Sequence, residues 1–351
     1  MTGAVTADTT LDIPDLAERW LREGRRFAMA TVAETWGSAP RPVGSHLIVD
    51  DQGHFEGSVS GGCVEGAVIA ESEQTIEDGR PRFLSFGVAD ETAWRVGLSC
   101  GGRISILVQS MAETSGIAGR LLASIGEARR RREPVALATE IASGRSLILQ
   151  GTDEPPDGDI GSAMAERLTG GVSGLAELPS GRFLITTYLP APRLVLLGAV
   201  HIAQELAPMA AAAGFEVTVI DPRSAFAAPQ RLPGVRVFAA WPDDALPEIG
   251  IDRYTAFAAL THDPKIDDPG LEAALTARCF YVGALGSRKT HMRRLERLRA
   301  RGIGEDALSE IHAPIGLEIG ARTPAEIAVA TLAEIIRARS SRSAQANEAA
   351  A

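Results

Sequence analysis

The sequence predicts an α/β protein in which an N-terminal mixed α/β domain is followed by a Rossmann-like, doubly wound parallel-sheet domain. Three observations predict this fold class. The chain has 351 residues, which is too long for one ordinary hydrophobic core. From Arg193 onward, strand and helix patterns alternate along the chain. The strands predicted there are continuously apolar, which is typical of parallel strands buried on both faces.

These patterns divide the chain into five segments. They are a flexible tail at 1–12, the N-terminal domain at 13–189, a linker at 190–193, the C-terminal domain at 194–338 and a disordered tail at 339–351. The linker is predicted from Pro190-Ala191-Pro192. Disorder of the last segment is predicted from its low complexity, since it consists largely of Ser, Ala, Glu, Asn and Gln.

In the N-terminal domain, the residue patterns predict three helices, at 13–23, 64–78 and 117–132. Strands are predicted in chain order at 27–35, 45–49, 82–86, 103–109, 135–140, 146–150 and 183–188. We expect the last three strands to complete one sheet with the others. The acidic, proline-containing stretch 152–159 is expected to form an exposed loop.

In the C-terminal domain, five strands are predicted, at 193–197, 216–220, 235–239, 256–260 and 280–284. Thr323-Pro324-Ala325-Glu326 has the pattern of a capping box with proline at the first helical position. This motif predicts the start of a long helix that ends near Arg337.

The charge of the chain is negative, because 35 Lys and Arg stand against 45 Asp and Glu, a net charge of −10. Such a surface repels nucleic acid and is not attracted to anionic membranes, so we expect neither as a partner. Three cysteines, an odd and sparse number, fit a reducing compartment better than a disulfide framework. Without a readable signal peptide, or the ~20 apolar residues of a membrane span, the sequence predicts a cytoplasmic protein.

The first strand–helix turn of the C-terminal domain resembles a dinucleotide-binding fingerprint. Gly198 and His201 lie in this turn, and Asp221 ends the next strand, where an acid would bind a ribose. Val200, however, occupies a position where glycine lets the backbone approach a pyrophosphate. The turn therefore indicates the fold more strongly than it indicates a bound dinucleotide.

Polar residues follow successive strands of this domain at their carboxyl ends, where open α/β sheets bind ligands. They are His201, Asp221 with Arg223, Thr261-His262-Asp263 and Gly286-Ser287-Arg288-Lys289. The amides of a helix start, together with Arg288 and Lys289, could hold a phosphate, and a capped helix with two solvated cations is the alternative. His262 and Asp263 are either a proton-transfer pair or residues that cap the following loop.

In the N-terminal domain, Cys63 follows Gly61 and Gly62 at a predicted helix start, where the helix dipole and backbone amides favour a thiolate. Cys100 also lies among glycines. Burial as a small hydrophobic residue fits Cys279, in an apolar strand, better than it fits these two. Two thiols without further ligands do not make a zinc site, so metal binding stays open.

Several motifs in register resemble the XdhC/CoxI family, accessory proteins of xanthine dehydrogenase and related molybdenum hydroxylases. The motifs of the first half are Gly37-Ser38-Ala39-Pro40-Arg41, Ser60-Gly61-Gly62-Cys63-Val64-Glu65 and Gly97-Leu98-Ser99-Cys100-Gly101-Gly102. The motifs of the second half are Asp221-Pro222-Arg223, Thr261-His262-Asp263, Gly286-Ser287-Arg288-Lys289 and Ala313-Pro314-Ile315-Gly316-Leu317-Glu318-Ile319-Gly320. Val200 departs from the family, whose members usually carry glycine there.

The resemblance implies a chaperone that binds and protects molybdenum cofactor, supports its sulfuration with a cysteine desulfurase and delivers it to a xanthine-dehydrogenase-like hydroxylase. Molybdopterin would be bound transiently, and both an activity of the protein's own and a homo-oligomeric state stay open. The expected cofactor-binding residues are Gly61, Gly62, Cys63, Cys100, Gly198, His201, Asp221, His262 and Arg288. Two alternatives are an NAD(P)-dependent oxidoreductase that uses the Rossmann-like domain and an assembly factor without a ligand.

Overall fold

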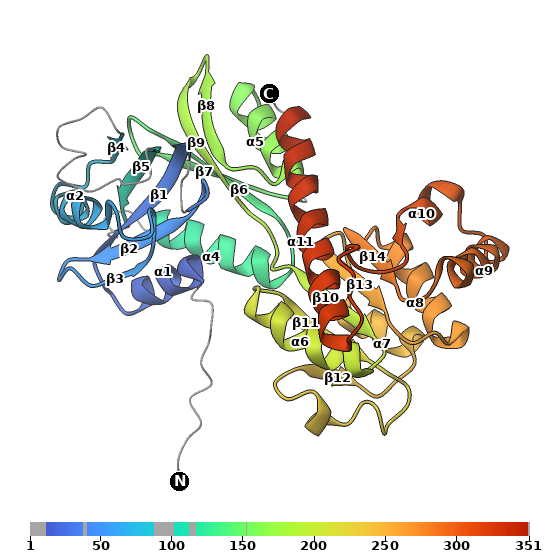
Figure 1. The fold of residues 1–351 in the computed structure, drawn as a ribbon. Coiled ribbons are helices and arrows are strands. Elements are labelled where there is room, and N and C mark those ends of the chain that lie inside the picture. The colour runs from blue at the N-terminus through green and yellow to red at the C-terminus, as the bar shows by residue number, and fades with distance from the viewer. Residues whose placement is uncertain (1–11, 38–40, 88–101, 112–116, 152, 350–351) are drawn as a thin grey trace, which may run out of the picture. The chain divides into compact units, whose positions relative to one another are not determined.

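The computed structural model describes residues 12–37, 41–87, 102–111, 117–151 and 153–349 (Figure 1). The chain divides into two compact units, one reaching to Pro190 and the other spanning Ala191–Gln345. This division lies within the segment predicted as a linker. Each unit has its own sheets and apolar clusters, so each is described by itself.

The first unit contains a five-stranded antiparallel sheet with the strand order β3-β2-β1-β5-β4. Its strands are β1 (Phe27–Trp36), β2 (His46–Asp50), β3 (Phe55–Gly57), β4 (Arg82–Phe86) and β5 (Arg103–Ser110), and the helices near it are α1 (Ile13–Arg22), α2 (Glu65–Asp78) and α4 (Ile117–Arg130). Successive side chains of the central strand β1 point to opposite faces of the sheet, and both faces are buried. Ala28 and Ala30 share an apolar cluster with α2, whereas Phe27 and Met29 share one with α1.

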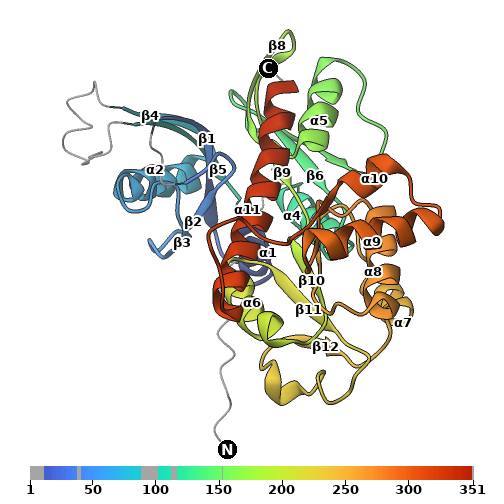
Figure 2. The ribbon, with the colours of Figure 1, turned by 45° about the vertical axis from the view of Figure 1, so that its right-hand side comes forward.

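A separate four-stranded antiparallel sheet in the same unit has the order β7-β6-β9-β8. It consists of β6 (Val135–Glu140), β7 (Ser146–Gln150), β8 (Gly174–Leu178) and β9 (Gly181–Tyr188), and α5 (Asp159–Gly170) packs on it (Figure 2). The prediction of a single sheet is therefore wrong, since an apolar pattern locates strands without saying which strands pair. β3, β8 and α5 were not predicted. β3 has only three residues, and β8 contains no β-branched side chain.

The second unit is built on a six-stranded parallel sheet with the order β12-β11-β10-β13-β14-β15. Its strands are β10 (Arg193–Leu197), β11 (Glu216–Ile220), β12 (Arg236–Phe238), β13 (Thr255–Ala259), β14 (Tyr281–Ala284) and β15 (Ile311–His312). Along β10, Leu194 and Leu196 enter one apolar cluster, and Val195 and Leu197 enter the cluster on the opposite face. This arrangement confirms the predicted Rossmann-like, doubly wound fold.

The connecting segments of this sheet are mainly helical. They include α6 (His201–Ala212), the short 3₁₀ helix η1 (Pro229–Arg231), α7 (Pro242–Ile249), α8 (Pro264–Thr276), α9 (Arg288–Ala300), α10 (Glu305–Ser309) and, after β15, α11 (Pro324–Ala349). Because the strands are parallel, their carboxyl ends meet at one edge of the sheet, together with the starts of α6, α8 and α9. This edge holds the polar residues singled out in the sequence.

The capping box at the start of α11 is confirmed: the Glu326 carboxylate accepts a hydrogen bond from the Thr323 N–H (2.9 Å), and the Glu326 N–H donates to the Thr323 hydroxyl (3.3 Å). The helix continues to Ala349, whereas disorder was predicted at 339–351. Residues 339–349 contain neither glycine nor proline, so low complexity here does not interrupt a helix. Among the described residues, neither α11 nor any other helix is long and apolar enough to cross a membrane.

Candidate functional site

The loop between β3 and α2 folds around the carboxylate of Glu65. One oxygen accepts hydrogen bonds from the Ser58 hydroxyl (2.8 Å) and the Ser60 N–H (2.9 Å), and the other from the Ser60 hydroxyl and the Gly62 N–H (2.8 Å). Burial alone would raise the pKa of Glu65, but the hydrogen bonds from Ser60 and Ser58 outweigh burial and lower this pKa to about 2. Glu65 is therefore the charged centre of the loop, a role that the sequence analysis did not assign.

Cys63 lies in this loop immediately before α2, but it is less accessible than its glycine neighbours suggested. Its side chain is partly buried and packs against an apolar cluster that includes Val59 and Val64. Gly61 and Gly62 have φ angles of 72° and 111°, which glycine adopts without steric cost. Since the Gly62 N–H donates to Glu65, it is not directed at a ligand. The second predicted thiol, Cys100, lies outside the described residues.

In the second unit, the turn after β10 is shaped by contacts within the protein. Gly198 has a φ of 111°, and a Cβ atom at this position would lie 2.6 Å from Cγ2 of Thr261. Glycine is thus required by the neighbouring turn, whether or not a ligand approaches. Val200 is the N-cap residue of α6, and His201 is exposed at the first position of that helix.

Asp221, the candidate ribose-binding acid, is fully buried and bonded to its own surroundings. One oxygen accepts from the Ala199 N–H (2.9 Å) and Arg223 Nη2 (2.7 Å), and the other from the Arg223 N–H (2.9 Å) and Nε (2.8 Å). Burial alone would raise the pKa of Asp221, but the hydrogen bonds from Arg223 and Ala199 lower it. The carboxylate therefore holds the first turn and Arg223 in place.

The turn after β13 is organised by Asp267, which is 1% exposed. Its carboxylate accepts hydrogen bonds from the Thr261 hydroxyl (2.6 Å) and the His262 N–H (3.0 Å). His262 is exposed and has a φ of 84°, which is uncommon for a residue other than glycine. Asp263 accepts a hydrogen bond from the Lys265 N–H (3.0 Å), so the structure shows it as the N-cap of α8.

A cavity of about 360 Å³ lies between this turn and α9. Its polar lining comprises His262, Asp267, Lys289, Arg293, Arg294 and Arg297, with Thr290 at the start of the helix. Of the predicted residues, the structure brings together His262 and Lys289 here. Gly198, His201, Asp221 and Arg288 do not line the cavity.

The cationic wall of this cavity was missed in the sequence, although a signal for it was present. Lys289, Arg293 and Arg297 are spaced four residues apart, so they lie on one face of α9. The prediction from sequence was confined to the first turn of the helix. There, Ser287 caps the helix by accepting from the Thr290 N–H (3.2 Å), and Arg288 is exposed.

Arg294 is the most buried cation of the cavity, with 2% of its side chain exposed. Its Nη2 donates to the Leu285 carbonyl oxygen (2.8 Å) and lies 3.9 Å from Oδ2 of Asp267. Within the described part of the chain, Nε and Nη1 have no hydrogen-bond partner. Burial lowers the pKa of this guanidinium and raises the pKa of Asp267.

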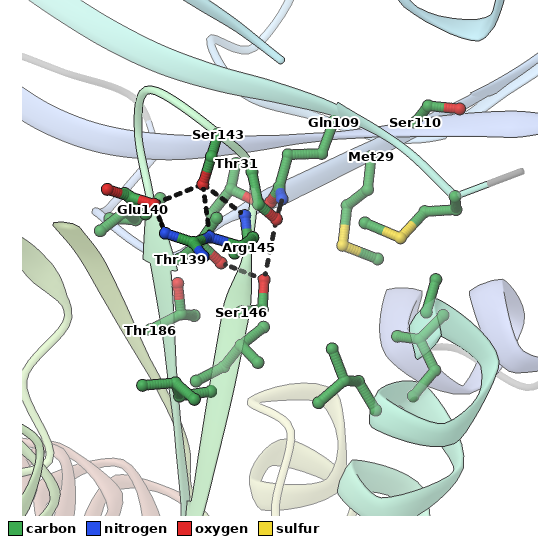
Figure 3. A pocket seen from close by; sticks show the side chains of 18 of the residues that line it. Met29, Thr31, Gln109, Ser110, Thr139, Glu140, Ser143, Arg145, Ser146 and Thr186 are labelled. Atoms are coloured by element: carbon green, nitrogen blue, oxygen red, sulfur yellow. Dashed lines mark hydrogen bonds and ion pairs between the residues drawn. The ribbon is translucent and has the colours of Figure 1, made fainter. Parts of the chain in front are cut away.

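A larger cavity, of about 1100 Å³, lies in the first unit between its two sheets and α4 (Figure 3). Uncharged polar groups from both sheets line it, namely Thr31, Gln109, Ser110, Thr139, Ser146 and Thr186. Charged side chains line it as well: Arg26, Glu77, Asp78 and the ion-paired Glu140 and Arg145. Gln109 Nε2 donates to the Gly144 carbonyl oxygen (3.2 Å) and thereby links the two sheets. Apolar side chains such as Met29, Leu122 and Leu137 complete the lining.

Behind the wall of this larger cavity, His46 supports Thr31. The Thr31 hydroxyl lies 2.9 Å from His46 Nδ1, and the His46 ring stacks on Tyr188. Burial lowers the pKa of His46 to about 4, so its imidazole is neutral near pH 7. No group of three or more potential metal-ligating side chains occurs among the described residues.

Comparison with known families matches both units. A family described as XdhC Rossmann domain matches residues 194–335, and a family described as XdhC and CoxI family matches residues 20–87. The chain is 30% identical over 320 residues to the molybdenum cofactor insertion chaperone PaoD of Escherichia coli K12, covering 91% of this chain and 85% of that protein. It is 28% identical over 326 residues to a probable xanthine dehydrogenase subunit of Bacillus subtilis 168, covering 91% and 95%.

Comparison with solved structures supports the fold. The crystal structure of a xanthine dehydrogenase from Bacillus halodurans superposes with a TM-score of 0.72 at 23% identity, covering 94% of this chain and 96% of that one. At this identity, the likeness establishes the shared arrangement of the chain and not a shared activity.

We predict that Glu65→Gln lowers the free energy of unfolding at pH 7 by about 2 kcal/mol, because buried N–H donors lose a charged acceptor. A carboxyl whose pKa is lowered to about 2 stabilises the fold fully above its unfolded pKa of roughly 4.3 and loses that contribution as pH falls toward 2. The difference between wild type and variant should therefore shrink between these pH values, measured by denaturant unfolding. Glu73→Gln, at an exposed position of α2, is the matched control, and equal losses in both variants would contradict this role for Glu65.

We also predict that Cys63 reacts with iodoacetamide faster than Cys279 in the folded protein. Cys63 is partly buried in a loop, whereas Cys279 is 5% exposed within the apolar core of the second unit. Mass spectrometry of timed samples, in a Cys100→Ser background, measures both rates. Equal rates would show that the loop protects Cys63 as fully as the core protects Cys279.

Proposed function

This chain belongs to the XdhC and CoxI family, and from that membership we propose that it is a chaperone that inserts molybdenum cofactor into a xanthine-dehydrogenase-like hydroxylase. The observation that carries the proposal is the similarity, over 91% of the chain, to a relative named as a molybdenum cofactor insertion chaperone. Protection of the cofactor, support of its sulfuration with a cysteine desulfurase and its delivery to the client are the finer parts of the same proposal.

The larger cavity of the first unit suits the pterin part of that cofactor. A pterin is a flat heterocycle with several hydrogen-bond donors and acceptors, and the hydroxyls of Thr31, Thr139, Ser146 and Thr186 are groups that can pair with it. The cavity volume of about 1100 Å³ is slightly above the roughly 300–1000 Å³ that is usual for small-molecule sites, so a pterin has room to bind there. The neutral His46 behind Thr31 keeps this part of the wall uncharged.

For the molybdenum end of the cofactor, Cys63 and Cys100 stay our candidates, because thiolates suit soft metal–sulfur centres. Cys63 packs with Ala28 and Ala30 on the α2 face of β1, whereas Met29 and Thr31 line the larger cavity from the other face, so Cys63 would reach the molybdenum only of a cofactor bound outside that cavity. Its participation is a proposal that rests on the chemistry of the thiol.

The alternative, an NAD(P)-dependent oxidoreductase, is disfavoured by the surroundings of Asp221. Each oxygen of this carboxylate already accepts two hydrogen bonds, from Ala199 and Arg223, so binding a ribose would require breaking contacts that hold the turn. Val200 adds a side chain where a pyrophosphate would approach the backbone.

We therefore expect no saturable binding of NAD, NADH, NADP or NADPH below 1 mM, since neither the ribose nor the pyrophosphate finds its usual partner. Isothermal titration calorimetry of the whole protein measures this directly. Submillimolar binding of any of the four, lost in Asp221→Asn, would favour the oxidoreductase over the chaperone.

We predict that the protein purified from a cofactor-producing host carries molybdenum and pterin, and that Ser146→Phe reduces both several-fold. The new ring would occupy the cavity beside Thr139, whose hydroxyl lies 2.9 Å from that of Ser146. Metal analysis and pterin fluorescence give the occupancy, and activation of an apo-hydroxylase gives the transfer. Ser162→Phe, at an exposed position of α5 outside the cavity, is the matched control.

Two results would count against this proposal. If the wild-type protein carries no more molybdenum and pterin than an unrelated protein from the same host, the chaperone function is wrong. If Ser146→Phe and Ser162→Phe retain the cofactor equally, the pterin does not bind in this cavity.

A further inference from the structure

We propose that the cavity between the β13–α8 turn and α9 is a binding site for a phosphate group, carried by a phosphomonoester or a diphosphate. The proposal does not depend on the chaperone function. It rests on the residues that surround this cavity and on the hydrogen-bonding groups that they leave without partners.

The first observation is the state of Arg294. A guanidinium that is 2% exposed would normally direct all its N–H groups at acceptors, because a buried donor without a partner is costly. Nη2 donates to the Leu285 carbonyl oxygen, but Nε and Nη1 have no partner within the described residues, and Arg294 lines the cavity. Nε and Nη1 are on different edges of the planar group, so they would not both bind one phosphate; what Arg294 brings to the cavity wall is a buried positive charge with N–H donors still unpaired.

Asp267 does not account for these donors. Its Oδ1 accepts from the Thr261 hydroxyl (2.6 Å) and its Oδ2 from the His262 N–H (3.0 Å), and the closest approach to Arg294 is 3.9 Å, from Nη2. The carboxylate balances part of the charge of Arg294 without hydrogen-bonding to it. Its hydrogen bonds hold the β13–α8 turn that closes the other side of the cavity.

The second observation is the charge on the same helix face. Lys289 and Arg293 line the cavity one turn apart, and no ion pair joins either of them to another residue in the part of the chain described. Arg297 also lines it but is paired with Asp268, with Nη2 2.9 Å from Oδ1. Four cations thus face two carboxylates, which leaves two positive charges, the complement of a phosphate dianion.

The third observation is the direction of the helix. The cavity extends along one side of α9, a helix of 13 residues, from Lys289 and Thr290 in its first turn to Arg297, so the positive end of the helix dipole adds to the side-chain charge at one end of the cavity. Because the whole chain carries a charge of −10, an anion approaches against the mean field and needs such local compensation. The cavity volume of about 360 Å³ leaves room for a phosphate with part of the group attached to it.

The test is isothermal titration calorimetry of the whole protein with sodium pyrophosphate at low ionic strength. We expect one site per chain with a submillimolar Kd. Lys289→Ala and Arg293→Ala should each weaken binding about tenfold, as expected when a charged hydrogen-bonding partner of an anion is removed. Arg288→Ala is the matched control, because Arg288 is an exposed cation of the same helix turn that does not line the cavity. It should change Kd less than twofold.

Both alanine variants alter exposed side chains, so their thermal midpoints without ligand should match the wild type within about 2 °C. Arg294 is not used for the primary test because it also holds the Leu285 carbonyl oxygen. The proposal is overturned if pyrophosphate shows no saturable binding, or if Arg288→Ala weakens binding as much as Lys289→Ala does.

Parallel titrations identify the source of the phosphate. Tighter binding of a nucleoside monophosphate than of inorganic phosphate indicates a phosphomonoester ligand, and tightest binding of pyrophosphate indicates a diphosphate. Cofactor content is a separate measurement. If the protein binds pyrophosphate but carries no pterin, the phosphate site is supported and the chaperone function is wrong. If it carries pterin but does not bind pyrophosphate, the chaperone function is supported and the phosphate site is wrong.

Discussion

Buried carboxylates hold the loops that carry most of the binding residues predicted from the sequence. Asp221 and Asp267 do this at the carboxyl edge of the parallel sheet, and Glu65 does it before α2. Each accepts backbone N–H groups that an α/β fold could otherwise direct at an anionic ligand. The loops are thereby fixed without a ligand, and the positive charge for an anion has to come mainly from side chains.

In the second unit, α9 supplies that charge. Its sequence places Lys289, Arg293 and Arg297 at intervals of four residues, so one helical face is cationic over three turns. Arg297 is neutralised by Asp268, which anchors the helix against α8, while the other two cations stay directed at the cavity. On the same helix face, Arg297 therefore packs against α8, and Lys289 and Arg293 are available to a ligand. In the first unit the lining of the larger cavity combines hydroxyl and amide groups with charges of both signs, so the two cavities suit different chemical groups.

The fold class and most strand positions could be predicted because local pattern determines them: β4 and β11 have the bounds that their apolar runs indicated. The division of the first unit into two sheets could not, because strand pairing is a long-range choice. The smaller cavity lies at the sheet edge that the sequence singled out, but of the two cations considered there only Lys289 lines it. Arg288 precedes Lys289 in sequence, yet the helical turn directs Lys289 to the cavity and leaves Arg288 exposed. Arg294 was missed since burial of a cation depends on packing that the pattern does not show.

Arg294 explains why the cavity is better understood as a binding site than as a packing feature. Burying a guanidinium costs several kcal/mol, and only part of this cost is offset by the Leu285 carbonyl oxygen and by Asp267 at 3.9 Å. A well-packed apolar residue would satisfy the contact between α8 and α9 without that cost. An arrangement that leaves two buried donors without partners is instead typical of functional sites, where local stability is lower until a ligand completes the hydrogen bonds. Occupation of the cavity by an anion would then stabilise the second unit by mass action, which couples binding at this edge to the stability of α9.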